Sequence, residues 1–378
     1  MAHSLAEEES LPDRNSAALS EEKINHINRK VVLPSTKKDY LSSQKQFLTW
    51  IGGSFPETLN EQGEIDVGKL EVRMLQSYIV QLKKADGSTP GIATMDKIRS
   101  SWFNLFRDSK VTVTEEEGNE ISVFFKGLRR LDAQMRASGE QAVVEGKSPI
   151  SFGLSKWIAM AFIRKSNTFA HLYLVLICKL MCRANNTASI RLNHLNWVQD
   201  CFGVFFAKTK CDQEGDHPKD PKHVYGNPCS PEICPLLSIG TYFLCIQEVW
   251  NTLFPGGSQN TRFSCMLTDV LRTSVGKQTC QSFGYRSDDF GVHSLRKGSS
   301  IYVSSGSTCG PCIVSLCLRC GWSMGGVQDR YLRYEATGDQ YCGTIVSGVQ
   351  LDSSQFAVLP PHFLDPLTLQ FHLLFSLN

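Results

Sequence analysis

The sequence predicts a mainly helical protein with two domains and one small antiparallel β-sheet. Apolar residues recur at a helical period through most of the chain. Only the segment 201–210 is rich in aromatic residues and valine, which is typical of a strand. Residues 138–150 are polar, lack apolar periodicity and contain Gly139, Gly146 and Pro149, so they are predicted to link the two domains. A chain of 378 residues is long enough for two separate cores.

The first domain is predicted over 34–137, after a flexible tail at 1–33 that is rich in Glu, Ser and Asn. Four amphipathic helices with short connections indicate a compact helical domain. We expect them to start near Thr36, to span 67–83, to follow Pro90 and to span 120–135. The polar face of the third helix presents Lys97, Arg99 and Arg107. These residues could contact a nucleic-acid backbone, or they could equally form a solvated basic face.

The second domain is predicted over 151–345, with 346–378 as a C-terminal tail. Its helices are expected at 154–164, 168–182, 234–254 and 265–276. The strand-like segment is followed by turn residues at 212–216, which predicts a small hairpin sheet. No apolar run reaches the 18 or so residues of a membrane span, and the acidic start of the chain lacks the pattern of a secretory signal.

The stretch from Gly291 to Tyr334 carries most of the candidate chemistry. His293 and Arg296 are three residues apart, so on a helix both side chains lie on one face and can reach one phosphate. Such a pair also occurs on ordinary solvated helix faces. Trp322 and Tyr331 follow. Cleavage of a phosphodiester needs a charge clamp, a proton donor and a nucleophile, and arginine, histidine and tyrosine can supply these three functions.

The order of these residues resembles that of the tyrosine recombinases, also called the phage-integrase family. The matching positions are Arg183, Lys210, His293, Arg296, Trp322 and Tyr331. Several strings are more closely similar to the recombinases of eukaryotic Crypton-type mobile elements: KCDQEGD, DPKHVYGNP with PEICP, GVHSLRKG and GWSMGGVQDRYLRYEATGDQY. The resemblance covers about residues 35–348.

The resemblance implies a helical core-binding domain over 34–137 and a tyrosine recombinase catalytic domain over 151–345, which together close around a DNA duplex. It implies that Arg183 and Arg296 hold the scissile phosphate and that Tyr331 attacks phosphorus to form a 3'-phosphotyrosyl link. Lys210 would protonate the leaving 5' oxygen. The link conserves the energy of the cut bond, so rejoining needs no metal or nucleotide cofactor. The family further implies a tetramer on double-stranded DNA, located in the nucleus and serving a mobile element.

The roles of two of these residues, Trp322 and His293, follow from the chemistry of their side chains. The indole N–H of Trp322 can donate to a phosphate oxygen but cannot shuttle a proton. His293 is then the imidazole that carries the proton. Three assignments stay open: Arg191 is an alternative to Arg183, Lys208 to Lys210, and Tyr334 to Tyr331.

Two other functions compete with this interpretation. The first is a non-catalytic DNA-binding protein derived from a recombinase. The second is a zinc-dependent protein built on Cys309-x-x-Cys312 and Cys317-x-x-Cys320. Only four residues separate these two pairs, so buried free thiols on a helix with Ile313 and Leu316 explain them better. A looser metal candidate comprises His223, Cys229 and Cys234.

Overall fold

The computed structural model describes residues 32–140, 146–198, 200–206, 220–246, 251–306, 310–322 and 336–348, together with Lys23 and Ile27. The chain divides into two compact units, residues 1–144 and 145–378. This division falls inside the segment that the sequence predicts as a linker. Each unit has a hydrophobic core of its own.

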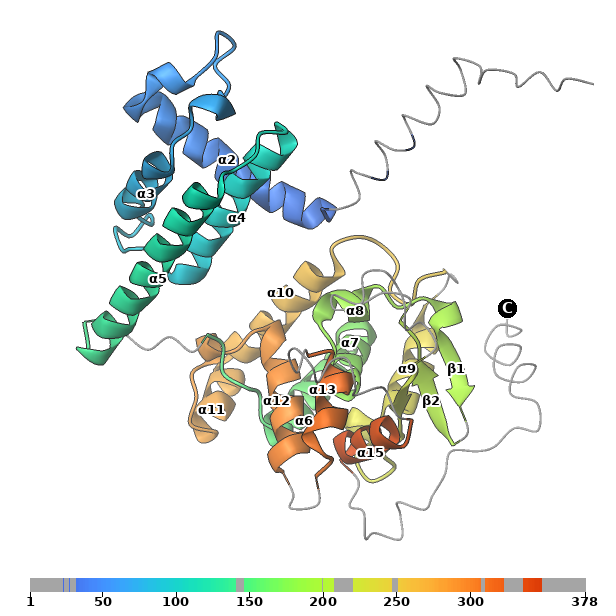
Figure 1. Ribbon diagram of the computed structural model, residues 1–378. Coiled ribbons are helices and arrows are strands. Elements are labelled where there is room, and N and C mark those ends of the chain that lie inside the picture. Colours follow the sequence, from blue (N-terminus) through green and yellow to red (C-terminus); the bar gives the residue numbers. More distant parts are fainter. Residues whose placement is uncertain are drawn as a thin grey trace, which may run out of the picture. The chain divides into compact units, whose positions relative to one another are not determined.

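The described part of the first unit consists of helices, 3₁₀ turns and the loops that join them, with one isolated β-bridge between Leu59 and Ile65. Its helices are α2 at Pro34–Ser54, α3 at Val72–Gln81, α4 at Ile92–Asp108 and α5 at Glu115–Ala137, with 3₁₀ turns at Pro56–Thr58 and Val67–Lys69 (Figure 1). The apolar faces of these helices meet around Ile79, Trp102 and Phe125, which are buried. Helix α5 begins earlier than predicted because Thr114 and Glu117 form a capping box that satisfies its first backbone N–H groups.

The second unit is built around α7. Its described helices are α6 at Phe152–Arg164, α7 at Thr168–Leu180, α8 at Ala184–Ala188, α9 at Pro235–Cys245, α10 at Gln259–Arg272, α11 at Ser274–Ser282, α12 at Val292–Ser305, α13 at Ile313–Cys320 and α15 at Ala336–Ser347. Of the 13 residues of α7, 11 are buried, so this helix is covered around its whole circumference. Helices α6, α9, α10, α12 and α15 pack against it (Figure 1).

Three short strands form an antiparallel sheet in the order β1-β2-β3. The strands are β1 at Leu195–Val198, β2 at Cys201–Val204 and β3 at Lys222–Val224. In the register, Gly203 lies opposite His223. The predicted fold class, mainly helical with a small antiparallel sheet, is confirmed. None of the helices in the described ranges is both long and apolar enough to cross a membrane.

Two predicted helices of the second unit have different bounds. Helix α9 ends at Cys245, before the predicted end at 254. The helix expected at 265–276 is divided at Thr273, which has extended backbone angles. The Thr273 hydroxyl accepts a hydrogen bond from the backbone N–H of Gly276 at 3.0 Å, so it caps a new helix, α11, where the sequence pattern suggested continuation.

Candidate active site

Helix α12 places His293 and Arg296 at the centre of the candidate site. It begins after Gly291, whose backbone N–H donates to the Ser294 hydroxyl at 3.0 Å. His293 is exposed, whereas only 3% of Arg296 is exposed. The two side chains are therefore close in sequence but differ in solvation, with the guanidinium deep in the site and the imidazole at its surface.

A glycine fixes the depth of α12 in the unit. The segment before α6 runs alongside the helix, and the backbone N–H of Ile150 donates to the Ser294 carbonyl at 3.0 Å. A Cβ atom on Gly298 would overlap the Ile150 carbonyl oxygen. The close approach of these two backbones holds α12, and with it His293 and Arg296, against the rest of the unit.

Arg183 comes from a different element, the turn between α7 and α8. Met181 ends α7 with a left-handed backbone, φ 49°, and the chain turns so that Arg183 becomes the N-cap residue of α8. Partial burial, followed by the charges of Arg296, Lys297 and Arg183, holds the pKa of His293 below its ordinary value. The structure thus brings Arg183 close enough to His293 for their charges to interact.

Arg296 is held by the end of α13. Its Nη2 atom donates to the Cys320 carbonyl, and its guanidinium carbon lies 5.6 Å from the centre of the Trp322 ring. Gly321 has φ 60° and ends α13, and the next backbone N–H, that of Trp322, donates to the Cys317 carbonyl at 2.9 Å. This turn presents Trp322 to Arg296. The indole stays 40% exposed, so it is also open to a ligand.

Lys222 is a further cation near Arg183 and Arg296, and it is not among the residues that the sequence predicts for the site. It is the first residue of β3 and is half-buried. Its Nζ atom donates to the Arg319 carbonyl and, at 3.4 Å, to the Leu180 carbonyl. Burial lowers the pKa of Lys222. Its place in the string DPKHVYGNP, which carries part of the family resemblance, was a signal that could have found it.

Two of the cations of the candidate site, Lys222 and Arg296, lie near the thiol of Cys182. Burial raises the pKa of Cys182, and the positive charges of Lys222 and, more weakly, Arg296 oppose that rise. Cys182 immediately precedes Arg183 in the chain. Lys222 and Arg296 therefore both lie near the turn that carries Arg183, although they come from a strand and a different helix.

A buried network of charged and hydrogen-bonded side chains lies next to the candidate site. Arg319 and Asp339 form an ion pair with 2.7 Å between Nη1 and Oδ2, and both side chains are almost fully buried. The backbone N–H and Nδ1 of His223 donate to the same carboxylate oxygen at 2.8 and 2.9 Å. Burial alone would raise the pKa of Asp339, but Arg319 and the bonds from His223 outweigh it and hold the pKa at about 2.

Some of the predicted residues lie outside the described part of the chain: Lys208, Lys210, Tyr331 and Tyr334. Their roles stay predictions. Arg191, the alternative to Arg183, is exposed at the start of a 3₁₀ turn, Leu192–His194. Its charge acts on the neighbouring His194, whereas Arg183 is the one of the two that acts on His293.

The cysteine segment differs in part from the expectation of a buried apolar face. Leu316 and Cys320 are buried and Cys317 is half-buried. The prediction of buried thiols is wrong for Cys312, which is exposed like Ile313 (63%), because the start of α13 lies at the surface. Cys309 lies outside the described residues. Among the residues that the structure does describe, no group of three or more His, Cys, Asp or Glu side chains could hold a metal ion. Of the looser candidate set, His223 is bound to Asp339 instead.

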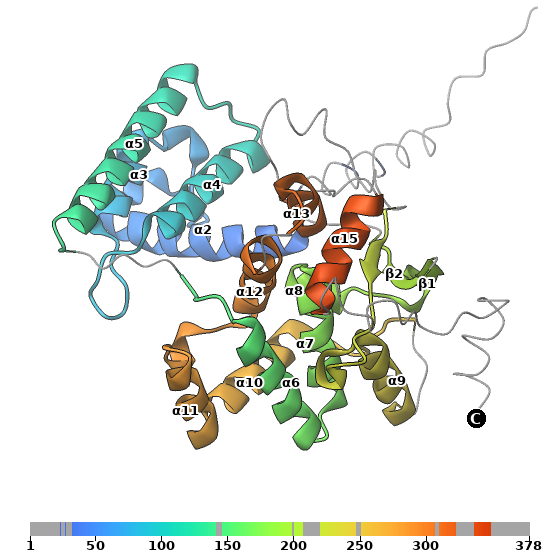
Figure 2. The same cartoon turned by 90° about the horizontal axis from the view of Figure 1, so that it is seen from below.

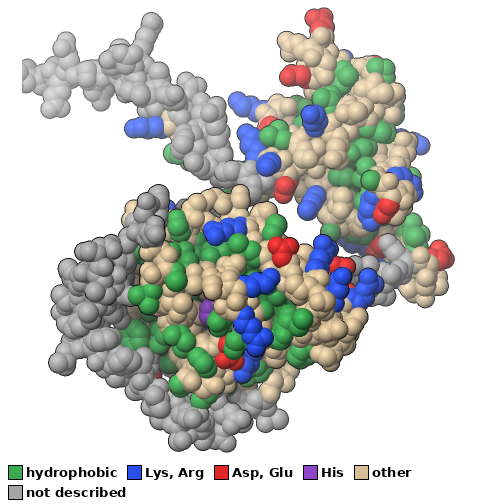
Figure 3. Space-filling model, turned by 180° about the vertical axis from the view of Figure 1, so that it is seen from behind, with side chains coloured by type: hydrophobic (Ala, Val, Ile, Leu, Met, Phe, Trp, Pro, Cys, Tyr) green, Lys and Arg blue, Asp and Glu red, His purple; other side chains and the backbone are tan. Residues whose placement is uncertain are grey.

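The predicted DNA-contacting residues of the first unit lie along α4. Lys97 and Arg107 are exposed, and the half-buried Arg99 lies 5.2 Å from the centre of the Phe125 ring. Arg99 and Arg107, together with Asp96 of α4 and Tyr40 of α2, line a hollow of about 480 Å³. Exposed Lys and Arg side chains are visible on each unit in Figure 3.

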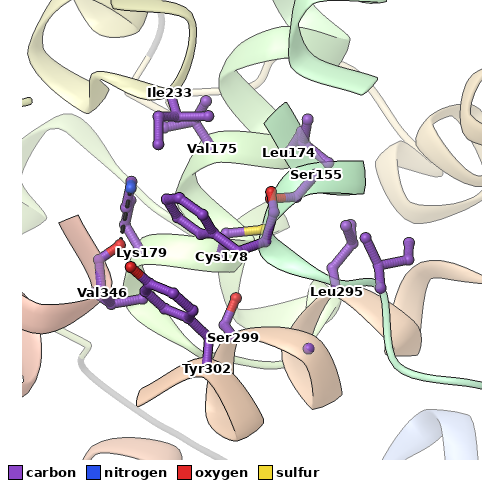
Figure 4. A pocket seen from close by; sticks show the side chains of 13 residues that line it. Ser155, Leu174, Val175, Cys178, Lys179, Ile233, Leu295, Ser299, Tyr302 and Val346 are labelled. Carbon is purple, nitrogen blue, oxygen red and sulfur yellow. Dashed lines mark hydrogen bonds between the residues drawn. The ribbon is translucent and has the colours of Figure 1, made fainter. Parts of the chain in front are cut away.

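A separate small cavity lies between α6, α7, α12 and α15 (Figure 4). Cys178, Lys179, Ser299 and Tyr302 are among the residues that line it, and its volume is about 20 Å³. This is room for about one water molecule, so the cavity is too small for a substrate. Lys179 donates to the Val346 carbonyl at 2.9 Å and to the Ser347 carbonyl, and burial lowers the pKa of this lysine to about 8.

No protein-family model matches the chain, and no curated protein matches it either. Among solved structures, the chain is similar to the XerH site-specific recombinase bound to difH substrate in a pre-cleavage complex. That match has a TM-score of 0.42 and 11% sequence identity, and it covers 80% of this chain and 74% of that chain. The post-cleavage complex of XerH with a palindromic difH substrate gives a TM-score of 0.44 and 11% identity, over 79% of this chain and 75% of that chain.

Proposed function

We propose that this chain is a DNA recombinase that cleaves and rejoins double-stranded DNA through a 3'-phosphotyrosyl intermediate. The observation that carries the proposal is the convergence of Arg183, His293 and Arg296. Charges from the turn before α8 and from α12 act on one imidazole. Two guanidinium groups beside a largely neutral histidine form a suitable site for a phosphodiester, whose negative charge grows in the transition state.

In the proposed reaction, Arg183 and Arg296 bind the two non-bridging oxygens of the scissile phosphate. The Cys320 carbonyl and the Trp322 ring already hold the Arg296 guanidinium, so little ordering is needed when the phosphate binds. Trp322 donates its indole N–H to a phosphate oxygen. His293 is exposed and largely neutral at pH 7, so it can accept or donate a proton at the reacting oxygens.

The proposed nucleophile is Tyr331, with Tyr334 as the alternative. The phenol gives its proton to His293, its oxygen bonds to phosphorus while the bond to the 5' oxygen breaks, and the leaving oxygen takes up one proton. Lys210 is the proposed donor of that proton. Lys222 is a second candidate, because its burial among the site cations lowers its pKa and makes it a better acid.

We further infer, from the strings that resemble Crypton recombinases, that the chain serves a Crypton-type mobile element and acts in the nucleus. Exchange between two duplexes by this chemistry requires four protomers, so a homotetramer on DNA is the proposed active form. Lys97, Arg99 and Arg107 on α4 are the proposed contacts of the first unit with the DNA backbone.

Covalent capture tests the proposal. Purified protein is incubated with nicked suicide duplexes from a random-sequence pool, and products are separated on a denaturing gel with EDTA present. Wild-type protein and Tyr334→Phe are expected to give an SDS-resistant protein–DNA band, which Tyr331→Phe loses. Native gels run in parallel measure DNA binding separately.

The alternative function is that of a non-catalytic DNA-binding protein. Native complexes without a covalent band on any substrate would support this alternative. Absence of both the native complexes and the covalent band would exclude a direct role on DNA. If Tyr334→Phe alone loses the covalent band, the nucleophile is Tyr334 instead of Tyr331.

A further inference from the structure

The buried pair Arg319–Asp339 connects four elements of the second unit. Asp339 lies in the first turn of α15, and Arg319 lies in the last turn of α13. Besides the ion pair, Arg319 Nη2 donates to the carbonyls of Lys179 in α7 and His223 in β3, both at 2.8 Å. Helix α13 packs against both α12 and α15, as Figure 2 shows. The guanidinium therefore ties the end of α13 to α7, β3 and α15.

The same turn of α13 holds the candidate site. The carbonyl of Arg319 accepts a hydrogen bond from Lys222, and the carbonyl of Cys320 accepts one from Arg296. Trp322 follows directly and lies against Arg296. Two cations thus bind the negative end of the α13 dipole, and their positions depend on where that end lies.

We propose that Asp339 is a positioning residue for Arg296. Through Arg319 it fixes the last turn of α13, and that turn fixes the Arg296 guanidinium and the Trp322 ring. As a catalytic effect this inference rests on the proposed function, but the geometric link from Asp339 to Trp322 does not. A carboxylate that served only to dock α15 would have no effect on Trp322 beyond that of any other anchor of the helix.

Lys179 provides the matched comparison. It is also buried, and it anchors the other end of α15 through the carbonyls of Val346 and Ser347. Arg319 bonds to the backbone carbonyl of Lys179, whereas the Lys179 side chain bonds to the carbonyls of α15. Lys179→Met therefore loosens α15 but leaves the bond from Asp339 to Arg319 in place.

The experiment uses the full chain labelled with fluorotryptophan. The sequence has six tryptophans, and the fluorine resonance of Trp322 is assigned as the one missing in Trp322→Phe. Spectra are recorded without DNA for the wild type, Asp339→Asn and Lys179→Met. A double variant, Asp339→Asn with Arg319→Met, removes both charges and serves if the single variant does not fold. The rate of covalent protein–DNA adduct formation is then measured at saturating protein, on a DNA substrate recovered from the covalent capture experiment.

We expect the Trp322 resonance to move in Asp339→Asn and in the double variant and to stay in place in Lys179→Met. The rate of adduct formation should fall on the order of 100-fold in Asp339→Asn, with the affinity for DNA unchanged. A Trp322 resonance that stays at its wild-type position in folded Asp339→Asn, or that moves equally in Lys179→Met, would overturn the inference. Failure of the wild type to form an adduct would refute the proposed function instead and leave the spectra interpretable.

Discussion

The guanidinium of Arg296 lies over the indole of Trp322, with 5.6 Å from its carbon to the ring centre. Because Arg296 also donates to the Cys320 carbonyl, its orientation is set before any ligand binds. A preoriented cation stabilises developing negative charge without a reorganisation cost during the reaction. The end of α13 is therefore as important for the proposed chemistry as α12, which carries the arginine.

Changes at Trp322 should separate the contribution of the ring from that of the N–H group. Trp322→Phe keeps an aromatic face but removes the indole N–H, so it should slow cleavage about fivefold, because one hydrogen bond contributes about 1 kcal/mol. Trp322→Ala removes the whole contact and should slow cleavage about 10- to 100-fold. Single-turnover rates of adduct formation measure both. Wild-type rates in Trp322→Ala would show that the ring does not orient Arg296.

The imidazole of His293 should titrate below pH 6.5, its ordinary value, because partial burial and three neighbouring cations disfavour its protonated form. Arg296→Met removes one of these charges and should raise the pKa. NMR titration of the imidazole in the free protein measures both values. An identical pKa in wild type and Arg296→Met would mean that the two side chains do not interact.

Gly298→Ala should destabilise the second unit by about 3 kcal/mol, because the new methyl group overlaps the Ile150 carbonyl and forces α12 away. Gly127→Ala is the control. Gly127 is exposed in α5 and has nothing within 4 Å of an added Cβ, so this change should stabilise its helix by up to about 1 kcal/mol. Denaturant unfolding compares the two variants. Equal effects would contradict the close packing of α12.

The buried Lys179 should make stability depend on alkaline pH. Burial lowers its pKa from 10.5 to about 8, so between these values the unfolded chain binds more protons than the folded one. The free energy of unfolding of the wild type, relative to Lys179→Met, should therefore rise as the pH increases from about 8 to 10.5, by up to about 3 kcal/mol. A flat difference across this range would show that Lys179 keeps its ordinary pKa in the folded protein, as a solvated lysine does.

The sequence allowed prediction of those features that depend on local pattern. The spacing of His293 and Arg296 places both on one face of α12, and the helical periodicity identified most helices of both units. The burial of Arg296 was not predictable, because a spacing of three residues does not show how deep each side chain lies. The end of α9 and the division at Thr273 also depend on local capping that periodicity does not report.

The network behind the site could not be predicted for a different reason. Arg319, Asp339 and His223 come from two helices and a strand, and the sequence pattern pointed to His223 only as part of a loose metal candidate with Cys229 and Cys234. Only tertiary packing brings them into one buried cluster. Gly298 is similar: a glycine inside a helix is locally unfavourable, and its reason lies in the backbone at Ile150, far away in the sequence.

Charge rescue on a modified substrate tests the proposed phosphate site most directly. Captured DNA is resynthesised with a methylphosphonate at the scissile position, which removes the negative charge that Arg296 is proposed to neutralise. Arg296→Ala should lose about 100- to 1,000-fold in adduct formation on phosphate DNA and recover most of that loss on the methylphosphonate. Arg191→Ala, the surface control, should cleave both substrates like the wild type. An equal loss in Arg296→Ala on both substrates would contradict the account, because Arg296 would then not act on the phosphate charge.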